Sequence, residues 1–340
     1  MINYYRKDSM KNYLIGIDGG GTKSHLAIFD QNGQLVTIGK YGPLNHEVME
    51  GSFTQLEKEL SSFIENTLAS VDAKVTDVAF AVMGIAGVDT KNQHAIVSAI
   101  VERIGFKKYI LCNDAFLGVS AGCPGGVGIC AINGTGSSMA AVDHSKTTVQ
   151  VGGLDNLSND CGGGSWFGTR LLAAVYEELF KCEAKTMMTE MVFDWFGIRD
   201  ADEFVEKIAN IDEDKAMMYE LNIMTFKAAA ANDPVAISIL QKSADHYAGG
   251  ITYLAKTLDF PVDKTLHITL AGSVFAKEKT HVLPDLLAAL VAKRLPGRAI
   301  EFHKLTTVPV AGAVYWAGKE AGYKIEMETI TKSLSEAGLM

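Results

Sequence analysis

The sequence predicts an α/β protein built from two domains that repeat one order of elements, βββαβαβ. The chain has 340 residues, which is long for one compact domain. Its apolar residues switch along the chain between the spacing of strands and the spacing of helices. A glycine-rich turn follows the opening strand of each half, at residues 18–22 and 133–137. We therefore interpret the chain as an internal duplication and not as a solenoid.

The first half begins with three predicted strands and continues with helices and strands in alternation. Asn32-Gly33 predicts a tight hairpin turn, because such turns need positive φ at their central residues. From residue 52 the apolar residues recur with the spacing of one helical face. The predicted elements are strands at 13–18, 24–30 and 34–42, a helix from residue 52, a strand at 75–88, a helix at 90–104 and a strand at 108–114.

The second half repeats this opening after the Gly/Pro-rich stretch 121–126, which favours a domain boundary there. It is predicted to contain three strands within 127–153, a helical stretch at about 165–258, a strand at 265–275, a helix near 281–295, a strand at 299–304 and a helix near 310–321. The predicted domains are 1–122 and 123–322, with the helical stretch as an insert in the second. The sequence does not define the placement of the extension 323–340.

Composition and charge restrict the class of protein. Hydrophobic residues make up 48% of the chain and charged residues 21%, and no run of 18 apolar residues occurs, which favours a globular protein over a membrane protein. The first 14 residues lack the apolar stretch of a signal peptide, so we expect a cytoplasmic location. The net charge of −9 argues against a nucleic-acid partner. The five cysteines form no zinc-ligand spacing and are expected to be free thiols.

Both glycine-rich turns have the composition of phosphate-binding loops. Their backbone N–H groups can point into the turn, and a ligand can approach without obstruction by Cβ. Neither turn matches the Walker pattern or the Rossmann fingerprint. Asp18 could hold a hydrated Mg²⁺ against phosphate oxygens, while Thr22 and Lys23 could add a hydroxyl and a charge. The alternative is that the glycines serve only the geometry of a hairpin.

Three stretches resemble the nucleotide site of a known superfamily. "IGIDGGGTKSHLAIFD", "INGTGSSMAAVD" and "LAGSVFAK" are similar to the two phosphate loops and the adenosine loop of the sugar kinase, actin and Hsp70 superfamily. Within it the chain most resembles the N-acetylglucosamine kinase-like group of the BadF/BadG/BcrA/BcrD-type ATPases, from about residue 13 to 320. The resemblance implies duplicated ribonuclease H-like domains with an interdomain cleft, and ATP with Mg²⁺ as cofactors. It implies phosphate contacts at Gly19, Gly20, Gly21, Thr22, Lys23, Gly134, Thr135, Gly136 and Ser137, adenosine contacts at Gly272 and Ser273, and Asp18 at the metal.

Four further stretches resemble the sugar site of that group. They are "YGPLNHEV" (41–48), "MGIAGVD" (83–89), "LCNDAFLGVSAG" (111–122) and "GGLDNLSNDCGGGSWFGTRLL" (152–172). The resemblance implies Asp114 as the catalytic base that accepts the proton of the sugar hydroxyl. It implies sugar contacts at Asn45, His46, Gly87, Asp114, Gly153 and Asp160.

The expected function is an ATP-dependent kinase that phosphorylates the 6-hydroxyl of an amino sugar. N-acetylglucosamine, N-acetylmuramic acid and glucosamine are the expected acceptors. Leu154, Asn159 and Cys161 stand where the family has Trp, Gly and Glu, and these departures leave the identity of the sugar open. The family suggests a homodimer as the assembly.

Other interpretations of the same residues stay open at this point. Asp114 could cap the helix that follows it. Asn45 and Asp160 could be turn residues, and Trp166 is more typical of a core. An activating ATPase of the 2-hydroxyacyl-CoA dehydratase or benzoyl-CoA reductase type would need cysteines that bridge an iron-sulfur cluster, and Cys123 and Cys130 lack that sequence context. A non-catalytic sugar-sensing regulator would be expected to carry a helix-turn-helix ahead of the first strand.

Overall fold

The chain forms two compact units. A computed structural model describes residues 12–211 and 215–339. One unit ends at Val127 and resumes at Leu305, and the other unit is Gly128–Lys304. This division differs from the predicted domains, because the chain after residue 304 belongs to the first unit and not to the second.

The first unit is built around a five-stranded sheet of order β3-β2-β1-β4-β5. Strand β1 pairs antiparallel with β2 and parallel with β4, which pairs parallel with β5. The elements are β1 (Tyr13–Gly19), β2 (Ser24–Phe29), β3 (Leu35–Tyr41), α1 (Ser52–Ala69), β4 (Val78–Ile85), α2 (Lys91–Ile104), β5 (Tyr109–Cys112), α3 (Ala115–Gly122), α11 (Pro309–Glu320) and α12 (Met327–Glu336), with short 3₁₀ turns at Val75–Asp77 and Pro124–Gly126.

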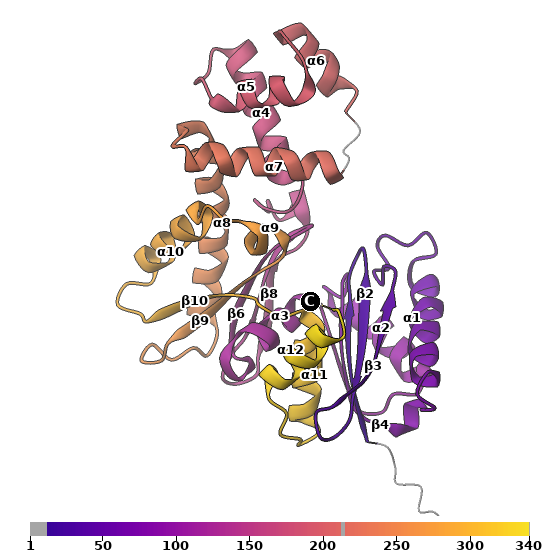
Figure 1. Cartoon of the computed structure of the whole chain (residues 1–340). Helices are drawn as coiled ribbons and strands as arrows, with labels where there is room; N and C mark the ends of the chain where they lie inside the picture. The colour runs from indigo at the N-terminus through magenta and orange to yellow at the C-terminus, as the bar shows by residue number, and fades with distance from the viewer. Residues whose placement is uncertain (1–11, 212–214, 340) are drawn as a thin grey trace, which may run out of the picture. The chain divides into compact units, whose positions relative to one another are not determined.

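Helices cover both faces of this sheet (Figure 1). Ile15 and Ile17 of β1 point into a core that they share with α1 and α2. Leu14 points to the opposite face, into a second core with α3, α11 and α12. A strand buried on both faces must be apolar at consecutive positions, which explains the run "LIGI" in the sequence.

Helix α11 belongs to the first unit because it packs directly on β1 and α3. A Cβ placed on Gly16 of β1 would lie 2.8 Å from Val314 Cγ2, and one on Gly312 would lie 2.3 Å from the Leu117 carbonyl oxygen. The apolar face of α11 therefore lies against glycine and backbone in this unit. The predicted assignment of 305–322 to the second domain followed the order of the chain, whereas packing decides the position.

The second unit repeats the topology of the first. Its sheet has the order β10-β9-β6-β7-β8, so the strand order β8-β7-β6-β9-β10 corresponds to β3-β2-β1-β4-β5. Its elements are β6 (Gly128–Asn133), β7 (Ser137–Val142), β8 (Thr148–Gly152), α4 (Trp166–Lys181), α5 (Met187–Phe196), α6 (Ala201–Ala209), α7 (Lys215–Ala230), α8 (Pro234–Thr257), β9 (Leu266–Ala271), α9 (Ser273–Lys277), α10 (Val282–Arg294) and β10 (Ile300–Lys304), with a 3₁₀ turn at Asp155–Leu157. The predicted duplication is confirmed.

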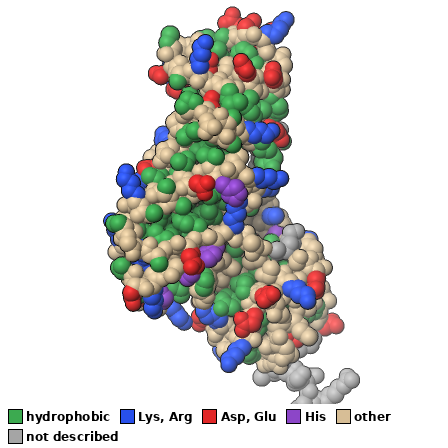
Figure 2. Space-filling view, turned by 60° about the vertical axis from the view of Figure 1, so that its left-hand side comes forward, with side chains coloured by type: hydrophobic (Ala, Val, Ile, Leu, Met, Phe, Trp, Pro, Cys, Tyr) green, Lys and Arg blue, Asp and Glu red, His purple; other side chains and the backbone are tan. Residues whose placement is uncertain are grey.

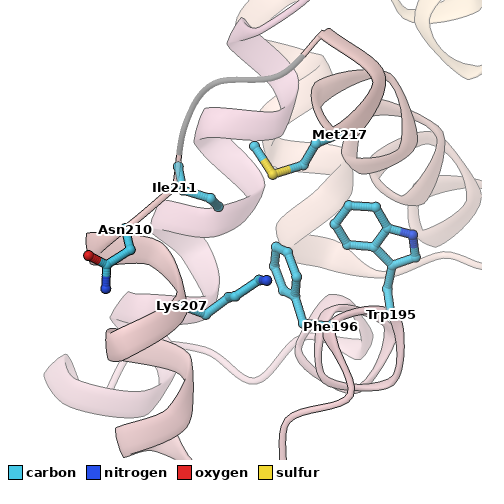
Figure 3. Close-up of a pocket in the computed structure, with 6 residues that line it drawn as sticks. All are labelled: Trp195, Phe196, Lys207, Asn210, Ile211 and Met217. Carbon is cyan, nitrogen blue, oxygen red and sulfur yellow. The ribbon is translucent and has the colours of Figure 1, made fainter.

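Helices α4 to α8 form the predicted helical insert between β8 and β9 (Figure 1). A cavity of about 420 Å³ opens among α5, α6 and α7, and none of the predicted site residues lines it. Figure 3 shows its lining residues, Trp195, Phe196, Lys207, Asn210, Ile211 and Met217. Across the described ranges, no helix combines the length and the apolar character that crossing a membrane requires.

Candidate functional site

The parallel strands of the first sheet end at one edge, and polar residues follow each of them. Asp18 lies near the end of β1, Asp89 follows β4, and Asn113 and Asp114 follow β5. In α/β sheets, ligands bind outside the carboxyl ends of such strands. This edge is the candidate site of the first unit.

Asp114 stands at the start of α3, but its neighbour caps the helix. The Asn113 Oδ1 atom accepts a hydrogen bond of 2.9 Å from the Ala115 amide, and the Asn113 Nδ2 atom donates one of 2.9 Å to Asp89. The Asp114 side chain makes no capping hydrogen bond. The interpretation of Asp114 as a simple helix cap is therefore not supported, and its carboxylate is left for another role.

The environment of Asp114 favours its protonated form. Burial, then the nearby charges of Asp18 and Asp89, raise its pKa to about 7, against the opposing effect of the backbone amides at 114 and 115. A carboxyl group with a pKa near neutrality can exchange a proton with a substrate at physiological pH. An aspartate with a purely structural role on the surface does not need a raised pKa.

Asp18 presents a carboxylate at the lip of the first glycine-rich turn. It is half-buried, and its Oδ2 atom lies 4.0 Å from Nδ1 of His25, its cross-strand partner on β2. Within residues 12–211 and 215–339, no cluster of three metal-ligating side chains includes Asp18. A cation held there would need other ligands from phosphate and water, which is how proteins commonly hold Mg²⁺.

The glycines of the first turn differ in what the protein requires of them. None has a positive φ. A Cβ on Gly19 would lie 2.7 Å from Ile85 Cδ1, and one on Gly20 would lie 3.0 Å from the Lys23 carbonyl oxygen, so packing accounts for both. A Cβ on Gly21 would meet only Asn45 Nδ2, at 3.9 Å. The protein's own contacts do not explain Gly21, whereas the close approach of a ligand would.

Thr22 and Lys23 lie exposed beside Gly21 at the tip of this turn. Both side chains are thus accessible to a ligand. The backbone carbonyl of Lys23 accepts a hydrogen bond of 3.2 Å from Gly20 N–H, which closes the turn.

Asn45, His46 and Gly87 are in mutual contact next to this turn. A Cβ on Gly87 would lie 2.4 Å from Asn45 Oδ1 and 3.0 Å from His46 Nδ1. The Asn45 Oδ1 atom also accepts a hydrogen bond of 2.9 Å from the Glu47 amide, as expected of a turn residue. His46 is buried and stacks on Phe53 with ring centroids 3.9 Å apart. These residues thus have structural contacts, and Asn45 Nδ2 faces the open side of Gly21.

The second unit has a matching turn between β6 and β7. Gly134 N–H donates to the Gly136 carbonyl at 3.0 Å, and Gly164 N–H donates to the Thr135 carbonyl at 3.0 Å. Thr135 and Gly136 are exposed, and a Cβ on Gly136 would meet nothing within 4 Å. Gly136 thus corresponds to Gly21, as a glycine that no contact in the protein requires.

The side chain of Ser137 is used inside the second unit. Its hydroxyl donates to Tyr247 at 2.8 Å, and Tyr247 donates in turn to the Ile132 carbonyl at 2.8 Å. Any contact of Ser137 with a phosphate would therefore be expected from its backbone.

Gly272 and Ser273 lie beside this second turn, after β9. Gly272 has φ of +90°, and a Cβ there would lie 2.4 Å from the Asn133 carbonyl oxygen, so the backbone itself requires glycine. Ser273 is exposed. The structure brings both residues next to Gly134, and the adenosine contact remains a prediction.

Asp160 and Gly153 form a closed local arrangement in the second unit. Asp160 Oδ2 accepts hydrogen bonds of 2.8 Å from Gly153 N–H and from the Ser158 hydroxyl. Its Oδ1 atom lies 3.6 Å from His246 Nε2, and the carboxylate side chain is only 2% exposed. The hydrogen bonds of Oδ2 fit the turn interpretation of Asp160, whereas Oδ1 has no hydrogen-bond partner among the described residues. The sugar contacts of Asp160 and Gly153 stay a prediction.

No sequence pattern described above points to Asp89, to Tyr247 or to the capping role of Asn113. Asn113 carries a signal that could have been used, because Asn is as good a helix cap as Asp. Tyr247 lies in the middle of a 24-residue helix, and nothing in its local sequence distinguishes it from a core residue. Such contacts across elements become visible only in three dimensions.

The repeated sheets and their paired glycine-rich turns define a fold class. A solved structure from Chromobacterium violaceum superposes with a TM-score of 0.62 at 21% identity, over 90% of this chain and 98% of that one. A ROK family glucokinase from Streptomyces griseus, solved with glucose and AMPPNP, gives a TM-score of 0.52 at 16% identity, over 91% and 99%. The chain shares the two-domain α/β fold of these structures.

Sequence comparison identifies the family within that class. The BadF/BadG/BcrA/BcrD ATPase family matches residues 15–317, so the chain belongs to this family. An N-acetylmuramic acid/N-acetylglucosamine kinase from Clostridium acetobutylicum is 24% identical over 263 residues, which are 77% of this chain and 85% of the relative. An N-acetyl-D-glucosamine kinase from Dictyostelium discoideum is 23% identical over 316 residues, or 90% and 98%. A glucosamine kinase from Vibrio cholerae is 29% identical over 238 residues, or 68% and 77%.

Proposed function

We propose that this protein is an ATP-dependent amino-sugar kinase that transfers the γ-phosphate to the 6-hydroxyl of the sugar. The observation that carries the proposal is Asp114, a carboxylate at the carboxyl edge of the first sheet that Asn113 frees from capping the helix. The names of the three relatives, all kinases of amino sugars, support the substrate class. N-acetylglucosamine is the acceptor that we expect first.

In this proposal Asp114 is the general base. Its carboxylate accepts the proton of the sugar hydroxyl as that oxygen attacks the γ-phosphorus, and the bond from this phosphorus to the β-γ bridging oxygen breaks, releasing ADP. A pKa of about 7 leaves a large fraction of Asp114 ionised at neutral pH, and any cation bound at Asp18 lowers that pKa by offsetting one of the two repelling charges.

The glycine-rich turn of each unit contributes backbone amides to the phosphates of ATP. Gly21 and Gly136 allow the close approach that a phosphate needs, because a side chain there would occupy space that the protein leaves open. Asp18 would hold Mg²⁺, which supplies neutralisation of the charge on the phosphate oxygens. Thr22 and Lys23 are exposed and accessible for further contacts.

The sugar-binding residues in this proposal are Asn45, His46 and Gly87. Gly87 lets Asn45 and His46 approach the loop after β4, and His46 Nδ1 has no hydrogen-bond partner among the described residues. A sugar hydroxyl or acetamido group could supply that partner. We leave Asp160 out of this set, because its Oδ2 atom already accepts two hydrogen bonds within the protein and its Oδ1 atom lies 3.6 Å from His246 Nε2.

The test is ADP release with Mg-ATP across a panel of N-acetylglucosamine, N-acetylmuramic acid, glucosamine and glucose. We expect turnover with at least one amino sugar, and a ³¹P NMR signal of a 6-phosphate in the product. The matched control is the 6-deoxy form of the preferred sugar, which should inhibit competitively without being phosphorylated. Phosphorylation of that analogue would disprove the 6-hydroxyl as acceptor, and no turnover with any sugar would disprove the kinase.

The described cysteines give no support to an activating ATPase of the iron-sulfur type. Cys123 and Cys130 are both buried, and they belong to different units. A cluster held across a dimer needs thiolates that face a partner.

A further inference from the structure

A histidine and carboxylate cluster lies on the second sheet, outside the site described above. His267 is on β9, and Glu301 and His303 are on the neighbouring edge strand β10. Glu301 pairs in register with His267 in this parallel ladder, and His303 is two residues further along β10. Because side chains alternate along a strand, all three lie on one face of the sheet.

The distances within the cluster fit one metal ion. His267 Nδ1 lies 3.1 Å from His303 Nε2 and 3.4 Å from Glu301 Oε2, and His303 Nε2 lies 3.7 Å from the same oxygen. Two ligands at tetrahedral positions about 2.0–2.1 Å from a zinc ion are separated by roughly 3.3 Å. The three atoms therefore form nearly the triangle that a tetrahedral ion would impose.

The chemistry of the three donors selects the class of ion. Imidazole nitrogen suits Zn²⁺, Ni²⁺ and Co²⁺, whereas Mg²⁺ and Ca²⁺ prefer oxygen ligands. Two histidines with one glutamate leave the fourth tetrahedral position for water. The side chains of His267, Glu301 and His303 are 24%, 57% and 35% exposed, so ion and water have access. Figure 2 shows that histidine side chains reach the surface of the molecule beside acidic ones.

The tautomers needed for such a site are available. To ligate, His267 must carry its proton on Nε2 and His303 on Nδ1, so that both facing nitrogens present lone pairs. Without an ion, one of these nitrogens donates to the other in the 3.1 Å contact. Metal binding replaces this contact by a shift of one imidazole to its other tautomer.

We infer that His267, Glu301 and His303 bind one divalent transition-metal ion of the Zn²⁺ class, which ties the edge strand β10 to β9. Within residues 12–211 and 215–339 this is the one group of three ligands with suitable distances. The site needs the observed strand register, because a slip of one residue would turn the donors of β10 to the other face. An ion bound there stabilises the native state of the second unit by linkage.

The experiment uses the full chain without a histidine tag. Isothermal titration with ZnCl₂ measures stoichiometry and affinity, and Co²⁺ serves as an optical probe of tetrahedral coordination. The variants are His267→Ala and His303→Ala, with His144→Ala as the matched control, because His144 is an exposed histidine of the same unit. Circular dichroism without metal checks that each variant folds, which we expect because the substituted side chains are partly exposed.

We expect one Zn²⁺ per chain in the wild type and in His144→Ala, with a rise in melting temperature on addition of zinc. Each ligand variant should bind Zn²⁺ at least roughly tenfold more weakly. Loss of a residue that only hydrogen-bonds to a metal ligand already weakens metal affinity by about this factor. Absence of stoichiometric binding in the wild type would overturn the inference. Wild-type affinity for Zn²⁺ in both ligand variants would overturn it as well. This measurement does not depend on kinase activity, so its outcome is independent of the proposed function.

Discussion

The two units have the same strand order, but the residues at the ends of their opening strands differ in charge, burial and hydrogen bonding. Asp18 ends the apolar run of β1, and Asn133 stands at the same place in β6. Asp18 is half-buried and keeps its carboxylate at the lip of the turn. Asn133 is fully buried, and its Oδ1 atom accepts a hydrogen bond of 2.8 Å from Gly163 N–H. The duplication therefore places a glycine-rich turn after the opening strand of both sheets, while only the first unit has an acidic residue there.

Among the changes that compare the two units, removal of the charge at Asp18 is expected to have the largest effect. We expect Asp18→Asn to lower kcat by roughly 10²–10³-fold, because the variant keeps the shape of the side chain but loses the ligand proposed for Mg²⁺. Steady-state kinetics at saturating Mg-ATP measure this. Glu65→Gln, an exposed carboxylate of α1 in the same unit, is the control and should retain wild-type activity.

The reciprocal substitution tests the second unit. Asn133→Asp should lower the free energy of unfolding by roughly 2–4 kcal/mol, because it places a charge at a fully buried position where the described residues offer one backbone N–H and no ion pair. Urea denaturation measures the change. The exposed substitution Asn156→Asp should change stability by less than about 0.5 kcal/mol. If Asn133→Asp were as stable as Asn156→Asp, the buried environment described for Asn133 would be contradicted.

The raised pKa of Asp114 predicts that this residue lowers the free energy of unfolding in a pH-dependent way. Its pKa is about 7 in the folded protein against 3.8 in the reference state, so the folded protein binds more protons between these values. The contribution of Asp114 to the free energy of unfolding is therefore most favourable below pH 4, where both states carry the proton. This contribution is lost as the pH rises through 7. We expect Asp114→Asn to be more stable than the wild type by roughly 1–3 kcal/mol at pH 8, and by little at pH 4. Thermal unfolding across this pH range would contradict the account if the difference were constant.

The smallest effect is expected at the two open glycines. Gly21→Ala and Gly136→Ala should leave stability nearly unchanged and raise the KM for ATP by roughly tenfold, because the added methyl group occupies only space proposed for phosphate. Gly16→Ala is the contrast, since its Cβ would lie 2.8 Å from Val314 and should destabilise the fold by roughly 1–3 kcal/mol. Unchanged ATP kinetics in both loop variants would count against the proposed phosphate contacts.

Much of the fold could be predicted because local patterns determine it. The apolar run before Asp18 and the Asn32-Gly33 turn give β1, β2 and β3 nearly at their observed bounds. The position of α11 could not be predicted in this way, since it depends on glycines at 16 and 312 that let two elements approach closely. Its sequence does not say which sheet it covers.

The candidate site was predictable where a residue type and its strand end coincide. Asp18 and Asp114 fall in this class, because parallel strands bring their carboxyl ends to one edge. The local contacts of Asp160 could not be predicted from the family motif. Its Oδ2 atom accepts hydrogen bonds from Gly153 N–H and from the Ser158 hydroxyl, and the predicted sugar contact stays a prediction.

The most direct test of the account compares phosphoryl transfer and nucleotide binding in Asp114→Asn. Sugar-dependent ADP formation should fall by roughly 10²–10⁴-fold, the range expected for loss of a general base, while the dissociation constant for ATP stays within about twofold of the wild-type value. The proposed function predicts both results on the same preparation. Retention of wild-type turnover by Asp114→Asn would contradict the assignment of Asp114 as the base.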